Sequence, residues 1–273
     1  MDKNLRQRIV SGIIMATLFL TLLLYSSGTA QALFIIIMLA LIYEYCSITL
    51  AGVSGAFTYV FTAILGSIAG VILGVYRYGD DTITTIVNSS SLAYITILLI
   101  ILFVFKRTAQ HKFLVIQALL YICLPIMALL YWIKETEDYR WILMSVFAMI
   151  WISDIAAYFV GKQFGKRKLF ESISPKKTWA GFLGAGIFSC ITAAVAYLYV
   201  GQFALLEWIT IGLIVWIFGS VGDLVESAFK RHYKIKDSGT ILVGHGGFLD
   251  RLDSFIFAIP VVLFYINFFL DAS

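Results

Sequence analysis

The feature that most constrains this chain is a series of long apolar runs separated by short polar segments. A helix of about 20 mostly apolar residues can cross the hydrocarbon of a bilayer, because all its backbone groups are hydrogen-bonded internally. The composition agrees: 61% of the residues are hydrophobic and 13% are charged, whereas soluble domains are about 45–50% apolar. We therefore expect an all-α fold, a polytopic membrane helix bundle.

About nine apolar runs are long enough to span a bilayer, although the fourth is short and could be tilted or partly re-entrant. The expected spans cover residues 9–25, 32–49, 57–76, 92–106, 113–133, 141–161, 179–200, 203–227 and 249–270. The first run could instead be a cleaved signal peptide, because basic residues precede it and small residues follow it at Ala30 and Ala32. Its length and the apolar runs after it favour a span.

The basic residues predict the orientation of the spans. With the N-terminus inside, all but three of the 20 Lys and Arg residues fall on the cytosolic side; the exceptions are Arg77, Lys134 and Arg140. Lys and Arg in short loops are retained in the cytosol. We therefore expect a multi-pass protein of the inner (cytoplasmic) membrane, N-inside and C-outside, with a basic cytosolic surface.

The two halves of the chain differ in their polar residues. Residues 1–140 hold about five spans and one acid within an apolar run, Glu44. That carboxylate either snorkels or pairs with a neighbouring helix, or it shapes a lipid-facing site. Residues 141–273 form the expected catalytic transmembrane region and contain two basic cytosolic loops, at about 162–178 and 228–248. The Cys and His residues have no zinc-site spacing.

Four aspartates of the second half are expected at one depth in the membrane: Asp154, Asp223, Asp250 and Asp253. At 1.5 Å per residue, Asp154 lies about 10 Å and Asp223 about 6 Å inside the cytosolic boundary. An ionised acid within a span costs about 2.5–3.5 kcal/mol, so these acids must be paired, protonated or metal-bound. Pairing with Lys230, Arg231 and Arg251 is the purely structural alternative.

Two loop motifs favour a phosphate ligand beside the acids. GHGG at 244–247 lets the backbone approach a ligand at a helix N-terminus, and SPKKTW at 174–179 places two lysines before a helix. A flexible turn and a solvated lysine anchor are the alternatives. Acids combined with bases indicate magnesium plus a polyphosphate, because the metal lets an anionic pocket accept an anion. The sequence has no Walker A or kinase motif.

The segment SAFKRHYKIKDSGTILVGHGGFLDRLD, residues 227–253, resembles the signature of the phosphatidate cytidylyltransferases, also called CDP-diacylglycerol synthases. DIAAYFVGKQFG, residues 154–165, and SPKKTW resemble the upstream motifs of that family. Lys162, Ala180 and Val243 depart from the family pattern. Because Ala180 stands where an acid is usual, we expect no acidic group to act at that position.

The resemblance implies a membrane nucleotidyltransferase of phospholipid biosynthesis that converts phosphatidic acid and CTP to CDP-diacylglycerol and pyrophosphate. It implies magnesium at one of two metal sites, with magnesium or a monovalent cation at the second, and a homodimer that binds no nucleic acid. The alternatives are a CTP-dependent enzyme acting on another lipid, a secondary transporter and a structural membrane anchor. A transporter would carry acids near the bilayer midplane and a repeat between its halves.

Under this hypothesis the site residues have three kinds of role. Metal ligands are Asp223 and Asp250, with Asp154 and Asp253 as further ligands or as partners of ligands. The residues expected to act in catalysis are Asp223, Lys230, Arg231, His245, Asp250 and Arg251. The residues expected to bind substrate are Ser174, Lys176, Lys177, Ser227, Lys236, Gly246 and Gly247.

Overall fold

The computed structural model of the protein describes residues 3–51, 60–62, 64–66, 111–239, 241 and 246–270. The chain divides into two compact units, and each unit combines two separate stretches of sequence. Unit 1 comprises residues 1–134 and 235–251, and unit 2 comprises residues 135–234 and 252–273. The expected functional division at residue 140 stays a prediction.

Six helical stretches in the described part of the chain are long and apolar enough to cross a membrane. They are Ser27–Thr49, Ile116–Glu135, Tyr139–Phe164, Trp179–Val200, Leu205–His232 and Leu249–Leu270. These stretches match six of the expected spans, and α1 (Lys3–Tyr25) covers the first. The expected spans at 57–76 and 92–106 lie largely outside the described residues. A polytopic helical membrane protein is therefore confirmed, whereas the number nine and the orientation stay predictions.

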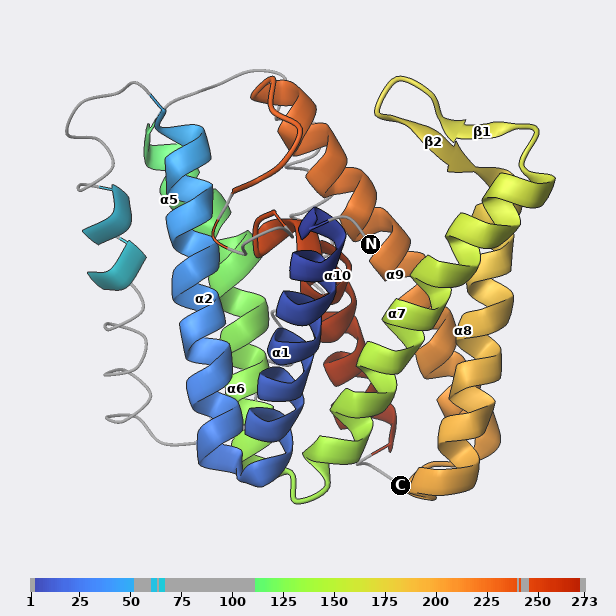
Figure 1. Cartoon of the computed structure of the whole chain (residues 1–273). Coiled ribbons are helices and arrows are strands. Elements are labelled where there is room, and N and C mark those ends of the chain that lie inside the picture. The colour runs from blue at the N-terminus through green and yellow to red at the C-terminus, as the bar shows by residue number, and fades with distance from the viewer. Residues whose placement is uncertain are drawn as a thin grey trace. The chain divides into compact units, whose positions relative to one another are not determined.

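In unit 1, a pair of antiparallel helices contacts a third helical stretch (Figure 1). Ser26 links α1 to α2 (Ser27–Thr49) and caps α2, since its Oγ accepts a hydrogen bond of 3.1 Å from Thr29 N. The third stretch consists of α5 (His111–Ala118), a π-helical turn at Leu119–Cys123 and α6 (Leu124–Glu135). Gln31 Nε2 donates to Leu130 O at 3.0 Å, and Tyr45 OH contacts Gln117 Oε1 at 3.0 Å.

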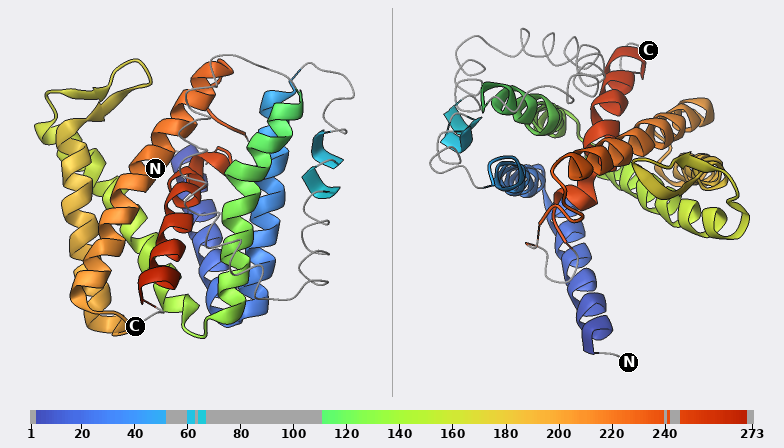
Figure 2. Two further views of the ribbon diagram at one scale, coloured as in Figure 1. Left: turned by 180° about the vertical axis from the view of Figure 1, so that it is seen from behind. Right: turned by 90° about the horizontal axis from the view of Figure 1, so that it is seen from above.

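In unit 2, three long helices pack side by side (Figures 1 and 2). They are α7 (Tyr139–Phe164), α8 (Trp179–Val200) and α9 (Leu205–His232). The last helix, α10 (Leu249–Tyr265), continues as a π-helical turn at Ile266–Leu270 and has Pro260 in its interior. Most of α10 belongs to unit 2, where the Phe255 ring stacks on Phe147 of α7 with ring centroids 4.4 Å apart.

A short antiparallel hairpin connects α7 to α8 where a loop was expected. Its strands are β1 (Lys168–Phe170) and β2 (Ser174–Thr178), with Lys168 paired to Thr178 and Phe170 to Ser174. The hairpin leads directly into α8, because the buried Thr178 Oγ1 accepts a hydrogen bond of 3.1 Å from Gly181 N. The expectation of a loop over 162–178 is wrong for these strands, and β2 carries three of the expected substrate-binding residues, Ser174, Lys176 and Lys177.

Helix α9 also exceeds its expected length, since it continues to His232 rather than ending near 227. Lys230 and Arg231 therefore lie on the last turn of a helix and not in a loop. Asp223 lies nine residues before His232, about 13 Å along the axis from the helix end. Cations on the last turn are favoured by the negative end of the helix dipole.

Thr178→Ala should destabilise the protein by about 1 kcal/mol, because the first turn of α8 loses its capping oxygen. The measurement is the apparent unfolding temperature in detergent, which should fall by roughly 2–4 °C. Thr178→Ser keeps the oxygen and serves as the control. Equal unfolding temperatures for the Ala and Ser variants would contradict a capping role.

Candidate functional site

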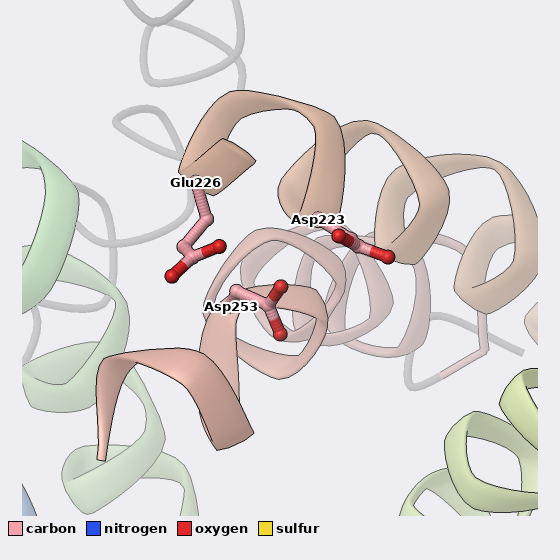
Figure 3. Close-up of side chains that lie close together, drawn as sticks. All are labelled: Asp223, Glu226 and Asp253. Carbon is pink, nitrogen blue, oxygen red and sulfur yellow. The ribbon is translucent and has the colours of Figure 1, made fainter. Parts of the chain in front are cut away.

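Three carboxylates meet between α9 and α10 in unit 2. Asp223 and Glu226 come from α9 and Asp253 comes from α10, and one oxygen of each lies within 4.8 Å of the others (Figure 3). The spacing of Asp223 and Glu226 places them on one face of α9. We call these three residues the acidic cluster. Glu226 is buried at 2% exposure, and the other two acids are half-buried.

The acidic cluster exists because α9 and α10 approach closely at Gly222. A Cβ atom on Gly222 would lie 2.5 Å from the backbone oxygen of Asp253 and 2.9 Å from Phe257 Cβ. A residue with a side chain would therefore push α10 away from α9. One turn earlier, a Cβ atom on Gly219 would lie 3.5 Å from Ser254 Cβ, which is ordinary contact.

Two lysines neutralise part of the acidic cluster. Lys177 of β2 lies 2.5 Å from Asp223 Oδ2, and Lys230 lies 2.6 Å from Glu226 Oε2, one helical turn away on α9. With all five groups ionised, three carboxylates face two ammonium groups, so one negative charge is in excess. This arrangement suits a cation, which would also reduce the cost of holding acids together in a membrane.

A cavity of about 210 Å³ in unit 2 extends beside Asp223. Its polar lining includes Ser153 and Asp154 of α7 and Lys176 and Lys177 of β2. Other parts of the wall are apolar and include Trp216, whose Nε1 donates to Phe182 O at 2.8 Å. Asp154, expected among the metal ligands, is an exposed residue at this cavity and lies outside the acidic cluster.

Asp250 belongs to unit 1 and binds backbone and hydroxyl groups there. Its Oδ2 accepts hydrogen bonds from Ser238 N at 2.9 Å, Ser238 Oγ at 3.0 Å and Gly247 N at 3.1 Å. Asp253, three residues later, belongs to unit 2. The expected association of Asp250 with Asp223 at a metal therefore stays a prediction.

The remaining expected residues occupy several elements. Ser227 Oγ on α9 lies 3.5 Å from Asp223 Oδ1, at the limit of a hydrogen bond. Arg231, Lys236 and Arg251 are exposed, and Gly246 has a φ of 87°, which favours glycine. His245 lies outside the described residues. The roles assigned to these residues stay predictions.

For two acids, Glu226 and Glu44, the structure shows neighbouring groups that the sequence did not identify. Glu226 joins the acidic cluster, and its spacing of three residues from Asp223 was the available signal. Glu44 does not snorkel, because it is 1% exposed and accepts hydrogen bonds from Leu249 N, at the start of α10, and from Phe248 N, just before it. The alternative that Glu44 pairs with a neighbouring helix is thus confirmed, and nothing in the local sequence of α2 identifies α10 as the partner.

The chain matches the model of the cytidylyltransferase family over residues 6–269. It is 48% identical over 130 residues to a phosphatidate cytidylyltransferase of Staphylococcus aureus (strain COL). The matched region covers 47% of this chain and 49% of that relative. It is also 50% identical over 123 residues to a phosphatidate cytidylyltransferase of Bacillus subtilis (strain 168). That matched region covers 44% of this chain and 45% of the relative. These matches span about half the length of the curated relatives.

Gly222→Ala should lower the apparent unfolding temperature in detergent by several degrees. The added methyl group overpacks the contact with Asp253, which typically costs about 1–3 kcal/mol. Gly219→Ala, one turn away on the same helix, is the matched control and should be neutral or stabilising, since alanine favours helix. A Gly222→Ala protein as stable as the Gly219→Ala protein would contradict the close approach of α9 and α10.

Proposed function

Because the chain belongs to the cytidylyltransferase family, we propose that it converts phosphatidic acid and CTP to CDP-diacylglycerol and pyrophosphate. The observation that carries the proposal is the acidic cluster with Lys177 bound to it at the edge of a cavity, in a helical membrane protein. The printed names of the relatives, phosphatidate cytidylyltransferase, supply the substrates. An enzyme acting in phospholipid biosynthesis on a membrane lipid fits the apolar helices.

The acidic cluster fits a magnesium ion. Magnesium prefers oxygen ligands at 2.0–2.1 Å, so opposite ligands lie about 4.2 Å apart. Only one pair among three ligands can be opposite, and neighbouring ligands of an octahedral ion lie about 2.9 Å apart. The three carboxylate oxygens, within 4.8 Å of one another, therefore need to close by at most about 2 Å. We propose Asp223, Glu226 and Asp253 as residues that hold magnesium, with Asp154 and Asp250 as further acids of a site with two metals. The second metal is magnesium or a monovalent cation.

The reaction joins two anions, so charge neutralisation and alignment are its main requirements. A phosphate oxygen of phosphatidic acid forms a bond to the α-phosphorus of CTP, and the bond from that phosphorus to the bridging oxygen of the β-phosphate breaks. Pyrophosphate leaves with the electron pair of that bond. A phosphomonoester has its second pKa near 6, so the attacking oxygen is largely ionised at neutral pH and needs no general base. Bound magnesium supplies charge stabilisation for the phosphates.

The basic residues of this chain bind the phosphates in our proposal. Lys177 and Lys176 on β2 hold phosphate oxygens at the cavity, which at about 210 Å³ is smaller than a typical ligand site and accommodates part of the substrates. The other proposed phosphate-binding side chains come from α9, the segment after it and α10: Lys230, Arg231, Lys236, His245 and Arg251. Ser174, Ser227, Gly246 and Gly247 are proposed to contact substrate through hydroxyl or backbone groups.

The location of the reaction follows from the distribution of charge. We propose nine spans, with the N-terminus and the active site on the cytosolic side of the inner membrane, because that orientation places most basic residues inside. A homodimer is proposed from the family resemblance. The bacterial relatives support a bacterial membrane protein.

Purified protein in detergent should form labelled lipid and pyrophosphate from phosphatidic acid, labelled CTP and magnesium, and a chelator should abolish turnover until magnesium is restored. Asp223→Asn should lower kcat at least about 100-fold, since the acidic cluster loses a charged ligand. Asp138→Asn is the control, because Asp138 is an exposed acid that binds Gln202. Normal turnover by folded Asp223→Asn protein would falsify this role. Lipid-independent ion flux in proteoliposomes, without product, would favour a transporter.

Lys177→Met should lower kcat/KM for CTP about 10- to 100-fold, because one charge-assisted hydrogen bond to a phosphate is lost. The expected signature is a raised KM for CTP in steady-state assays. Lys166→Met is the matched control, since Lys166 is an exposed lysine that precedes the hairpin and does not line the cavity. Equal kinetics for the two variants would exclude Lys177 from phosphate binding.

A further inference from the structure

Glu44 of α2 is a buried carboxylate bound to the start of a helix about 200 residues later in the chain. Its Oε1 accepts a hydrogen bond of 2.9 Å from Phe248 N, and its Oε2 accepts one of 3.0 Å from Leu249 N. The first N–H groups of a helix have no partner within that helix. A carboxylate at this position satisfies two of them and is stabilised by the positive end of the helix dipole.

Ser238 connects Glu44 to Asp250. Its Oγ lies 3.3 Å from Glu44 Oε2 and 3.0 Å from Asp250 Oδ2, and its backbone N donates to the same Asp250 oxygen. A hydroxyl group has one hydrogen, so Ser238 donates to one carboxylate at a time. Because Gly247 N also donates to Asp250, both ends of the segment from Ser238 to Gly247 are tied to these two acids.

Two glycines allow the backbone to close on the Glu44 carboxylate. A Cβ atom on Gly247 would lie 2.6 Å from Glu44 Oε2, and one on Gly239 would lie 2.6 Å from Glu44 Oε1. Glu44 and Ser238 are 1% and 5% exposed, so water has little access to replace these hydrogen bonds. The backbone positions of residues 238–239 and 247–249 are therefore fixed around this carboxylate.

We propose that Glu44 is a positioning residue for the reaction: it fixes the N-terminus of α10 and, through Ser238, the orientation of the Asp250 carboxylate. This inference rests on the proposed function, in which Asp250 acts in the site. Glu44 is enclosed by backbone amides and Ser238, so it acts through these groups and does not contact the reacting atoms. A cap for α10 alone would need only a Ser or Asp beside the helix, whereas Glu44 also contacts the Ser238 hydroxyl group, which contacts Asp250.

Glu44→Gln tests the proposal because it keeps the size of the side chain and removes its charge. The amide NH₂ group would face a backbone N–H or the Ser238 hydroxyl, so at least one hydrogen bond is lost. We expect kcat to fall about 10- to 100-fold, as for residues that orient ligands at a site, with KM for CTP changed less than about threefold. Amide hydrogen exchange should quicken in residues 246–252.

Glu207→Gln is the matched control. Glu207 also accepts a hydrogen bond from a backbone amide at a helix start, 2.6 Å from Ala204 N, at the opposite end of α9 from Asp223. The Glu207→Gln protein should turn over within about twofold of the wild-type rate. The substitution also removes the charge of a carboxylate that binds the start of a helix, but Glu207 has no connection to Asp250. A fall in kcat equal to that of Glu44→Gln would attribute the effect to capping in general and overturn the proposal.

A double-mutant cycle with Ser238→Ala separates positioning from general destabilisation. If Glu44 acts through Ser238, the double variant should lose little more turnover than Glu44→Gln alone, whereas independent effects would multiply and overturn the proposal. If the Glu44→Gln protein does not fold, Ser238→Ala decides by itself, because it keeps the backbone bond to Asp250 and removes only the connecting hydroxyl. Unchanged kcat in that variant overturns the proposal.

The failure of this inference is distinguishable from the failure of the proposed function. A wild-type protein that makes no CDP-diacylglycerol contradicts the function. A wild-type protein that makes it, together with unchanged turnover in folded Glu44→Gln protein, contradicts only the positioning role. The measurement of amide hydrogen exchange needs no substrate. Unchanged exchange at residues 246–252 of the Glu44→Gln protein would therefore show, in either case, that Glu44 does not fix the N-terminus of α10.

Discussion

A carboxylate inside a helical membrane protein needs compensating groups, because hydrocarbon offers neither water nor counter-ions. The structure meets this requirement in two ways. In unit 2 two of the three acids of the acidic cluster are paired with ammonium groups, Asp223 with Lys177 and Glu226 with Lys230. In unit 1 Glu44 is balanced by backbone amides and a hydroxyl group.

The two kinds of compensation suit different chemical tasks. Lysine partners can exchange one anion for another, so a carboxylate held by lysines is able to accept a metal while the lysines bind phosphate. Backbone amides at a helix start have fixed directions and cannot leave, so a carboxylate held by them fixes geometry. The acidic cluster is therefore suited to ligand binding, and Glu44 is suited to holding a segment in place.

The sequence predicted the helical spans well where they are described, because the length and polarity of an apolar run follow from the thickness of the bilayer alone. It also placed Asp223 and Asp253 among the candidate residues. It missed the hairpin of β1 and β2, since Ser-Pro at 174–175 is typical of a turn, whereas these residues lie in β2 and the turn of the hairpin is at residues 171–173. It ended α9 too early, because helix formation does not stop where hydrophobicity does.

The sequence by itself determined that this chain is a polytopic helical membrane protein with a signature typical of the cytidylyltransferases, since both depend on residues close together in the chain. Only the tertiary structure decided which acids meet. Asp253 reaches Asp223 and Glu226 because Gly222 lets two helices approach, and Glu44 reaches Phe248 and Leu249 from the second helix of the chain. Such pairings depend on distances between segments far apart in sequence, which no local pattern specifies.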